Sequence, residues 1–98
     1  MGTYFVVLRR RGPAWRAGVP LEQQSGWVEH AAFMDALVDD GFVVLGGPLA
    51  DEQRVVLVVE STSAVEVSTV LAGDPWSRSH LVVDSIDAWT VRLDGRRR

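Results

Sequence analysis

An unbroken apolar run opens the chain at residues 3–8, between Gly2 and the arginines at positions 9–11. The β-branched valines in its centre predict a β-strand, which the arginines close. Residues 12–24 contain two glycines and two prolines and predict a loop. Because so long a loop in a small domain is often a lid or a binding loop, Trp15 in its middle either pins the loop to the protein or walls a binding site.

A helix is predicted to follow, because the apolar spacing changes to three and four residues from Ser25 onward. Ser25 is the expected N-cap, Glu29 places negative charge in the first turns, and Gly41 is expected to end the helix. The apolar face that this spacing defines consists of Trp27, His30, Ala31, Met34, Leu37 and Val38.

Two further apolar segments, residues 42–45 and 54–60, predict a β-hairpin. Gly46, Gly47 and Pro48 are expected to end the first of these strands, and residues 51–52 to form the turn.

Residues 63–72 carry conflicting signals. Their valines favour a strand, whereas Ser63 and Glu66 have the spacing of a capping box and Gly73 supplies a stop, so we predict a helix. Residues 80–86 predict another strand, and the alternation over residues 89–93 predicts a short fifth one. The order β-α-β-β-α-β with a tail strand predicts a single α+β domain over residues 1–98, of the ferredoxin-like arrangement with an extra C-terminal strand.

Both faces of the predicted sheet are apolar. Tyr4, Val6 and Leu8 lie on one face of the first strand, while Phe5 and Val7 lie on the other. The helices of such a fold cover only one face, so a second copy packed sheet to sheet is expected to cover the other. The sequence therefore predicts a homodimer.

Composition and charge narrow the function classes. Apolar residues make up 47% of the 98 residues and charged residues 23%, which is ordinary for a globular protein. The net charge of −3 argues against a nucleic-acid partner, and no cysteine is present for a disulfide, a thiol nucleophile or a metal ligand. Since no apolar run approaches the roughly 18 residues of a membrane span, and residues 1–5 do not resemble a signal peptide, we expect a soluble cytoplasmic protein.

All ten basic residues are arginines, and three stand in a row at positions 9–11 and again at positions 96–98. We interpret both runs as solvated ends, with attraction of an anion as the alternative.

The predicted topology brings several polar residues to one rim of the sheet, where the first helix starts, the second strand ends and the fourth strand begins. Asp74 follows the last turn of the second helix, where a carboxylate needs a compensating donor, and His30 would provide one. A structural His and a plain Asp-Pro turn are the alternatives for these two residues. The same rim holds Gly46, Gly47, Pro48, Trp76, Ser79 and His80.

Each of these neighbours has two interpretations. The glycines either end a strand or let a ligand approach backbone N–H groups closely. Trp76 either walls a pocket or fills a gap in the helix packing. His80 is a candidate second base, and two histidines without an adjacent carboxylate motif are weak grounds for a metal site, so no metal and no cofactor are expected.

Together these segments resemble the YCII-related (YciI-like) family from Tyr4 to about Leu93. The residues that carry the resemblance are Tyr4-Phe5-Val6-Val7-Leu8, Glu29-His30-Ala31-Ala32-Phe33-Met34, Gly46-Gly47-Pro48-Leu49 and Asp74-Pro75-Trp76. The resemblance implies a dimeric α/β barrel with a ferredoxin-like protomer. It also implies an active-site His–Asp dyad at His30 and Asp74, in a family that includes enzymes acting on small ring compounds by acid–base elimination.

Three functions remain open at this stage. The first is a lyase, isomerase or hydrolase in which His30 moves a proton, Asp74 orients it, Gly46 and Gly47 offer donors to an oxyanion, and Trp76 and Trp15 wall the substrate. The second is a non-catalytic metabolite-binding or regulatory dimer that uses the same pocket. The third is a cofactor-free oxygenase of the same barrel group.

Overall fold

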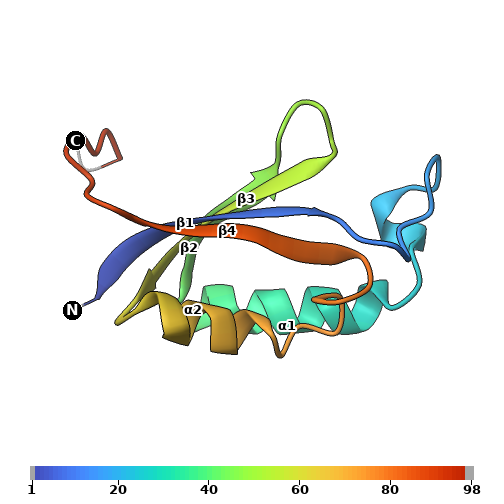
Figure 1. Cartoon of the computed structure of the whole chain (residues 1–98), viewed down its shortest axis with the longest axis horizontal. Coiled ribbons are helices and arrows are strands. Elements are labelled where there is room, and N and C mark those ends of the chain that lie inside the picture. Colours follow the sequence, from blue (N-terminus) through green and yellow to red (C-terminus); the bar gives the residue numbers. More distant parts are fainter. Residues whose placement is uncertain (1, 97–98) are drawn as a thin grey trace.

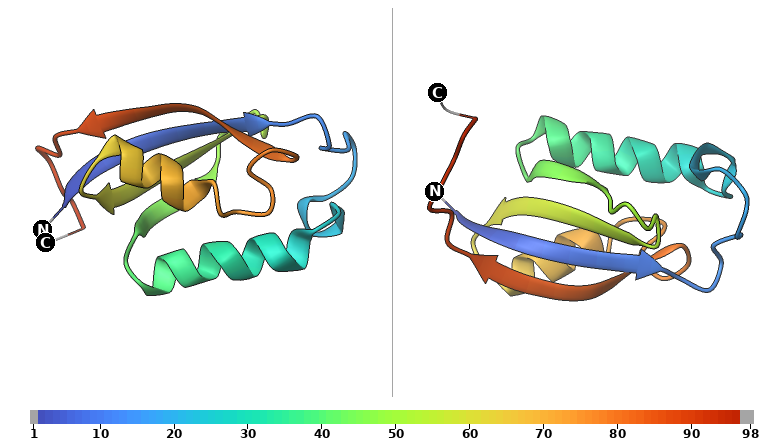
Figure 2. Two further views of the ribbon diagram at one scale, coloured as in Figure 1. Left: turned by 60° about the horizontal axis from the view of Figure 1, so that its bottom comes forward. Right: turned by 90° about the horizontal axis from the view of Figure 1, so that it is seen from above.

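Four antiparallel strands form one sheet in the order β2-β3-β1-β4, and two helices cover one of its faces (Figures 1 and 2). The computed structural model describes residues 2–96. Its elements are β1 (Thr3–Arg11), the 3-10 turn η1 (Leu21–Gln23), α1 (Trp27–Asp39), β2 (Val43–Pro48), β3 (Arg54–Ser61), α2 (Ala64–Leu71) and β4 (Leu81–Trp89). The predicted α+β class and the predicted element order up to β4 are confirmed.

β1 lies in the middle of the sheet, and its side chains alternate between the two faces. Phe5 and Val7 are buried on the face that the helices cover, where they join a core that α1, α2, β2 and β3 complete. The inward series continues past the apolar run, because Arg9 is buried as well. Val6 and Leu8 point to the opposite face, which no described element covers (Figure 2, right).

The capping signals at residues 63–72 prevail over the strand propensity of the valines. The Ser63 hydroxyl accepts a hydrogen bond from the Glu66 N–H at 3.1 Å, and the Glu66 carboxylate accepts from the Thr62 N–H at 3.1 Å and from the Ser61 hydroxyl. The helix then buries Val67 and Leu71 against the sheet. The prediction of a helix here is confirmed.

The predicted N-cap of the first helix is wrong. α1 begins at Trp27 with Gly26 at the cap position, and no side chain caps it. Gly26 has a φ of 77°, a left-handed conformation that favours glycine. Ser25 instead contacts His80, with 3.2 Å between its hydroxyl and Nε2. Gly41, with a φ of 87°, ends the helix as predicted.

The predicted fifth strand is also wrong. β4 continues to Trp89, which lies opposite Tyr4 at the start of β1, so β4 already extends to the end of its partner. Residues 90–94 form no strand, and the side chain of Leu93 is exposed. The alternation at residues 89–93 therefore reflects the end of β4 and an extended segment beyond the sheet.

Gly46, Gly47 and Pro48 belong to β2 instead of ending it, and they lie opposite Leu57, Val56 and Val55 of β3. A Cβ atom at Gly46 would stand 2.7 Å from Leu57 Cδ2, so a larger residue at this position would require the Leu57 side chain to shift.

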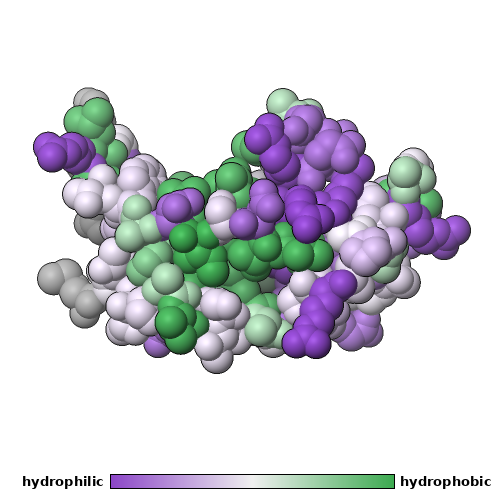
Figure 3. All heavy atoms as spheres, viewed as in Figure 1, coloured by the Kyte–Doolittle hydropathy of each residue, from purple (hydrophilic) through white to green (hydrophobic). Residues whose placement is uncertain are grey.

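Hydrophobic and hydrophilic side chains are unevenly distributed over the surface. In the orientation of Figure 1, hydrophobic atoms gather at the level of the sheet and hydrophilic atoms cover the β2–β3 turn (Figure 3). Neither described helix is long and apolar enough to cross a membrane. Of the second arginine run, residues 97–98 lie outside the described part of the chain.

Candidate functional site

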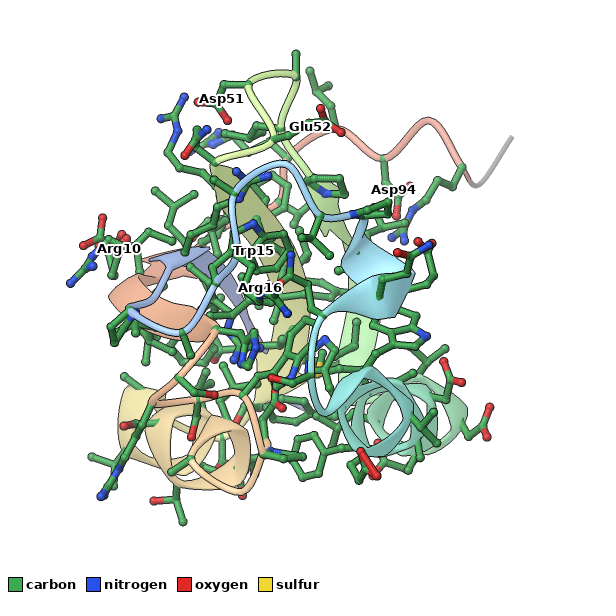
Figure 4. All side chains as sticks on the ribbon, turned by 90° about the vertical axis from the view of Figure 1, so that its right-hand side faces the viewer. Arg10, Trp15, Arg16, Asp51, Glu52 and Asp94 are labelled. Carbon is green, nitrogen blue, oxygen red and sulfur yellow. The ribbon has the colours of Figure 1, made fainter. Side chains whose placement is uncertain are left out.

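A cavity of about 720 Å³ lies on the helix side of the sheet, between α1, β2 and the loop at residues 12–24. Figure 4 looks at the end of the molecule where this loop lies, with Trp15 and Arg16 near the centre and the β2–β3 turn, carrying Asp51 and Glu52, above them. The volume is in the range of small-molecule sites. The walls are mainly apolar, and the polar side chains among them are Arg9, Arg11, His30, Asp51, Glu52 and Gln53.

His30 lies in the first turns of α1 and lines this cavity. Its Nδ1 is 2.9 Å from Oδ1 and 3.0 Å from Oδ2 of Asp74, which follows α2. His30 is 7% exposed and Asp74 only 2%. The fold thus brings together the two residues that the sequence reasoning paired, and it places the carboxylate behind the imidazole as seen from the cavity.

Arg9 is a third member of this cluster, and sequence reasoning missed it. Its guanidinium lies 2.9 Å from Oδ2 of Asp74 and donates to the Leu81 carbonyl at 2.8 Å, with only 1% of the residue exposed. A signal for it was present, because positions 5, 7 and 9 share one face of a strand. The run of three arginines suggested a solvated end and hid that alternation.

Asp74 is held as a carboxylate by its neighbours. Burial raises the pKa of Asp74, but the hydrogen bonds from His30 and from the Trp76 N–H, together with the charge of Arg9, outweigh burial and lower the pKa overall. An ionised carboxylate is an acceptor only, so it fixes the proton of a neutral His30 on Nδ1. The Nε2 lone pair is then the basic site of the ring.

Trp76 packs between the two histidines and does not line the cavity. Its ring stacks on His30 at 4.1 Å between centroids and 9° between planes, and on His80 at 4.6 Å and 18°. The indole N–H donates to the Ser25 carbonyl at 2.9 Å. Trp76 therefore fixes the plane of the His30 ring from behind, which is the packing role that sequence reasoning held open for it.

His80 is buried beneath Trp76 and is likewise not part of the cavity wall. Its two ring nitrogens face hydroxyls, with Nδ1 2.8 Å from Ser79 and Nε2 3.2 Å from Ser25. Burial lowers the pKa of His80, and the nearby His30 lowers it further. His80 and Ser79 are thus part of the support beneath the site.

The other predicted site residues lie on the cavity wall. Gly46, Gly47 and Pro48 contribute the β2 side, and Trp15 contributes the loop side. β2 is an edge strand, so alternate backbone N–H groups on its outer edge are not used by the sheet.

The loop at residues 12–24 is tied down by a residue that sequence reasoning did not single out. The Gln24 side chain accepts from the Arg16 N–H at 2.9 Å and donates to the Arg16 and Val19 carbonyls at 2.8 and 2.9 Å. Trp15 also packs edge-on against Trp76, with 5.9 Å between ring centroids. The loop is therefore a fixed part of the cavity wall as well as the connection between β1 and α1.

Within residues 2–96, no group of three or more His, Asp or Glu side chains is placed to hold a metal ion. A buried carboxylate that orients an imidazole on a cavity wall is an arrangement suited to proton transfer. Comparison of the chain with protein-family models, with curated proteins and with solved structures finds no match.

Proposed function

We propose that this chain is a small-molecule enzyme in which His30 transfers a proton and Asp74 orients the imidazole and stabilises its charged form. One observation carries the proposal: His30 lines an apolar cavity while a buried, ionised carboxylate holds its Nδ1. An imidazole held in one tautomer is suited to act as a general base and then as a general acid. The reaction class is an elimination, isomerisation or hydrolysis.

The rest of the cavity fits this chemistry. Nε2 of His30 takes a proton from the substrate, and the resulting imidazolium is stabilised by Asp74 at 2.9 Å. Negative charge that develops on a substrate oxygen is met by backbone donors on the outer edge of β2 at Gly46 or Gly47, where the absence of side chains allows close approach. Trp15 and Trp27 supply aromatic wall for an apolar substrate.

We also propose that the chain is a YCII-related protein with a ferredoxin-like protomer, and that two copies form a dimeric α/β barrel. The quoted segments around Tyr4, His30, Gly46 and Asp74 support this, together with the α+β class and the strand order β2-β3-β1-β4.

The test uses His30→Gln, which removes the base while keeping a polar side chain of similar size. Small ring compounds that carry a leaving group or an acidic C–H bond are incubated with the protein in D₂O and followed by proton NMR. For any compound that the wild type converts, we expect His30→Gln to lower the rate by roughly 10²–10⁴-fold. The matched control is Glu29→Gln on the exposed side of the same helix, which should convert at the wild-type rate.

Wild-type turnover in a folded His30→Gln variant would refute the catalytic role. Compounds that bind in the cavity and are recovered unchanged, with no deuterium incorporated, would replace the enzyme by the metabolite-binding module.

A further inference from the structure

Two arginines of β1 meet at one end of the cavity. Arg9 and Arg11 are two residues apart on one strand, so their side chains leave on the same face, and both line the cavity. The Arg11 guanidinium lies over the Trp15 ring, with 4.6 Å between its central carbon and the ring centroid. The loop that closes the cavity is thus in contact with this basic end.

These two guanidiniums have donors with no acceptor. Nε of Arg9 and Nε of Arg11 are both shielded from solvent and have no hydrogen-bond partner within residues 2–96. The terminal nitrogens of Arg9 already contact Asp74 and the Leu81 carbonyl, and both arginines belong to the cavity wall. Because buried polar groups in native proteins are paired, these donors indicate a missing acceptor.

The charges around the cavity specify what kind of acceptor is missing. The charge of Arg9 is balanced by Asp74, whereas Arg11 forms no ion pair with a carboxylate of residues 2–96. The remaining acidic groups on the wall are Asp51 and Glu52, which lie exposed on the β2–β3 turn (Figure 4), and Asp51 is paired with Arg54 at 3.0 Å. With a neutral His30, the interior therefore carries one uncompensated positive charge, which suits a monoanion.

The apolar walls indicate the chemical character of the rest of the ligand. Beyond the arginines, the lining includes Val19, Leu21, Trp27, Met34, Val43 and Leu57. A fully polar anion would leave these side chains against water, whereas a ring or branched chain would cover them.

We propose that Arg9 and Arg11 form an anion-binding end of the cavity and that the substrate of His30 is a small carboxylic acid with an apolar body. The substrate assignment rests on the proposed function, but the anion site itself does not. Arg9 and His30 both lie within 3.0 Å of the Asp74 carboxylate, so an acid anchored on the guanidiniums has the carbons next to its carboxylate beside the imidazole.

The test measures binding of 2-naphthoate by calorimetry and by amide NMR shifts at fixed ionic strength, with 2-naphthamide as the uncharged probe of the same shape. We expect 2-naphthoate to bind at least tenfold more tightly than 2-naphthamide and to shift amides around the cavity. Arg11→Met should weaken 2-naphthoate at least tenfold and leave 2-naphthamide unchanged, while Arg11→Lys should recover part of the affinity. The control is Arg16→Met, whose exposed side chain is not part of the wall and whose substitution should change neither affinity.

Equal binding of the two probes, or unchanged 2-naphthoate affinity in Arg11→Met, would overturn the anion site. Tighter binding of 2-naphthyl phosphate than of 2-naphthoate would overturn the choice of a carboxylate. His30→Gln separates the two proposals, because it should keep 2-naphthoate binding while losing turnover. A different outcome would reject this inference and leave the proposed function standing: the wild type does not bind 2-naphthoate, and His30→Gln abolishes the turnover of neutral compounds only.

Discussion

At the scale of single residues, Asp74 is the centre of the site, because three donors converge on one buried carboxylate. His30 contacts both of its oxygens, Arg9 lies 2.9 Å from Oδ2, and the Trp76 N–H donates to Oδ1 at 2.8 Å. A buried charge held in this way is costly to leave unpaired, so changes at Asp74 affect stability as well as chemistry.

Asp74→Asn is predicted to reverse the tautomer of His30. The amide has one oxygen, so its NH₂ must face either the Arg9 guanidinium at the Oδ2 position or the Trp76 N–H at the Oδ1 position. Facing the charged Arg9 is the worse choice, so we expect the NH₂ at the Oδ1 position, where it also faces His30 Nδ1 and favours a ring proton on Nε2. Nitrogen-15 NMR of the imidazole measures this directly. We also expect the free energy of unfolding to fall by about 3–5 kcal/mol, because Arg9 loses its charge partner. An unchanged tautomer in a folded variant would contradict this account of how Asp74 orients His30.

His80 makes stability depend on pH in the mildly acidic range. Burial, assisted by His30, lowers the pKa of His80, so below about pH 6.5 the unfolded chain binds a proton there that the folded protein refuses. The free energy of unfolding should therefore fall as the pH drops from about 6.5 toward the lower pKa of the folded state. Urea unfolding across this range measures the slope, which His80→Gln should reduce. An equal slope in the variant would contradict it.

Asp74 acts in a separate and more acidic window. Its pKa is lowered in the folded protein, so its contribution to stability is present above about pH 3.9 and is lost as the pH falls through the lower folded value.

At the scale of elements, the start of α1 is where backbone geometry and site geometry meet. Gly26 caps the helix in a left-handed conformation, and a Cβ atom there would stand 3.1 Å from Trp76 Nε1. That nitrogen donates to Ser25, and the same ring stacks on His30. The helix cap at Gly26, the Trp76 indole and the His30 imidazole are therefore in contact one after another, so a shift at the cap is expected to displace the imidazole.

Gly26→Ala is predicted to destabilise the protein more than Gly41→Ala, although both replace a left-handed glycine at an end of α1. In each variant the left-handed backbone conformation lowers the free energy of unfolding by about 1–2 kcal/mol. Only Gly26→Ala also presses on Trp76 and disturbs its hydrogen bond, for about 1 kcal/mol more, since nothing lies within 4 Å of a Cβ at Gly41. Denaturant unfolding gives the difference, and NMR shifts of His30 should change in Gly26→Ala alone. Equal losses would show that Trp76 has room to move.

Local patterns predicted most of the elements, and contacts distant in sequence decided the rest. The capping box at Ser63 and the helix stop at Gly41 depend only on residues a few positions apart, so both can be recognised in the sequence. The prediction of a fifth strand was wrong because the alternation at residues 89–93 cannot show that β1 begins opposite Trp89 and offers no partner beyond it. Arg9 was missed because its ion pair is with Asp74, 65 positions away in the sequence, and only the fold brings the two side chains together inside the protein.

At the scale of the whole molecule, the sheet is covered on one face only. The open face carries Val6, Leu8 and Val58, and it is bordered by the C-terminal segment and by the β2–β3 turn, which stand up on either side of it in Figure 1. Leu45, paired with Val58, is 55% exposed there. Such a face on a small protein is the kind of surface that a second copy covers.

Leu45→Glu is predicted to dissociate the proposed homodimer, because it places a charge on the apolar face through which the two sheets are proposed to pack. Val65→Glu is the matched control: it adds the same charge at an apolar side chain that is 75% exposed on α2, on the opposite side of the molecule. Sedimentation at micromolar concentration should give a dimer for the wild type and for Val65→Glu, and a monomer for Leu45→Glu. A monodisperse wild-type monomer would refute the dimer, and dissociation by Val65→Glu alone would move the interface from the sheet to the helices. Since the cavity lies on the helix side, 2-naphthoate binding to the Leu45→Glu monomer would then show whether one copy suffices for the site.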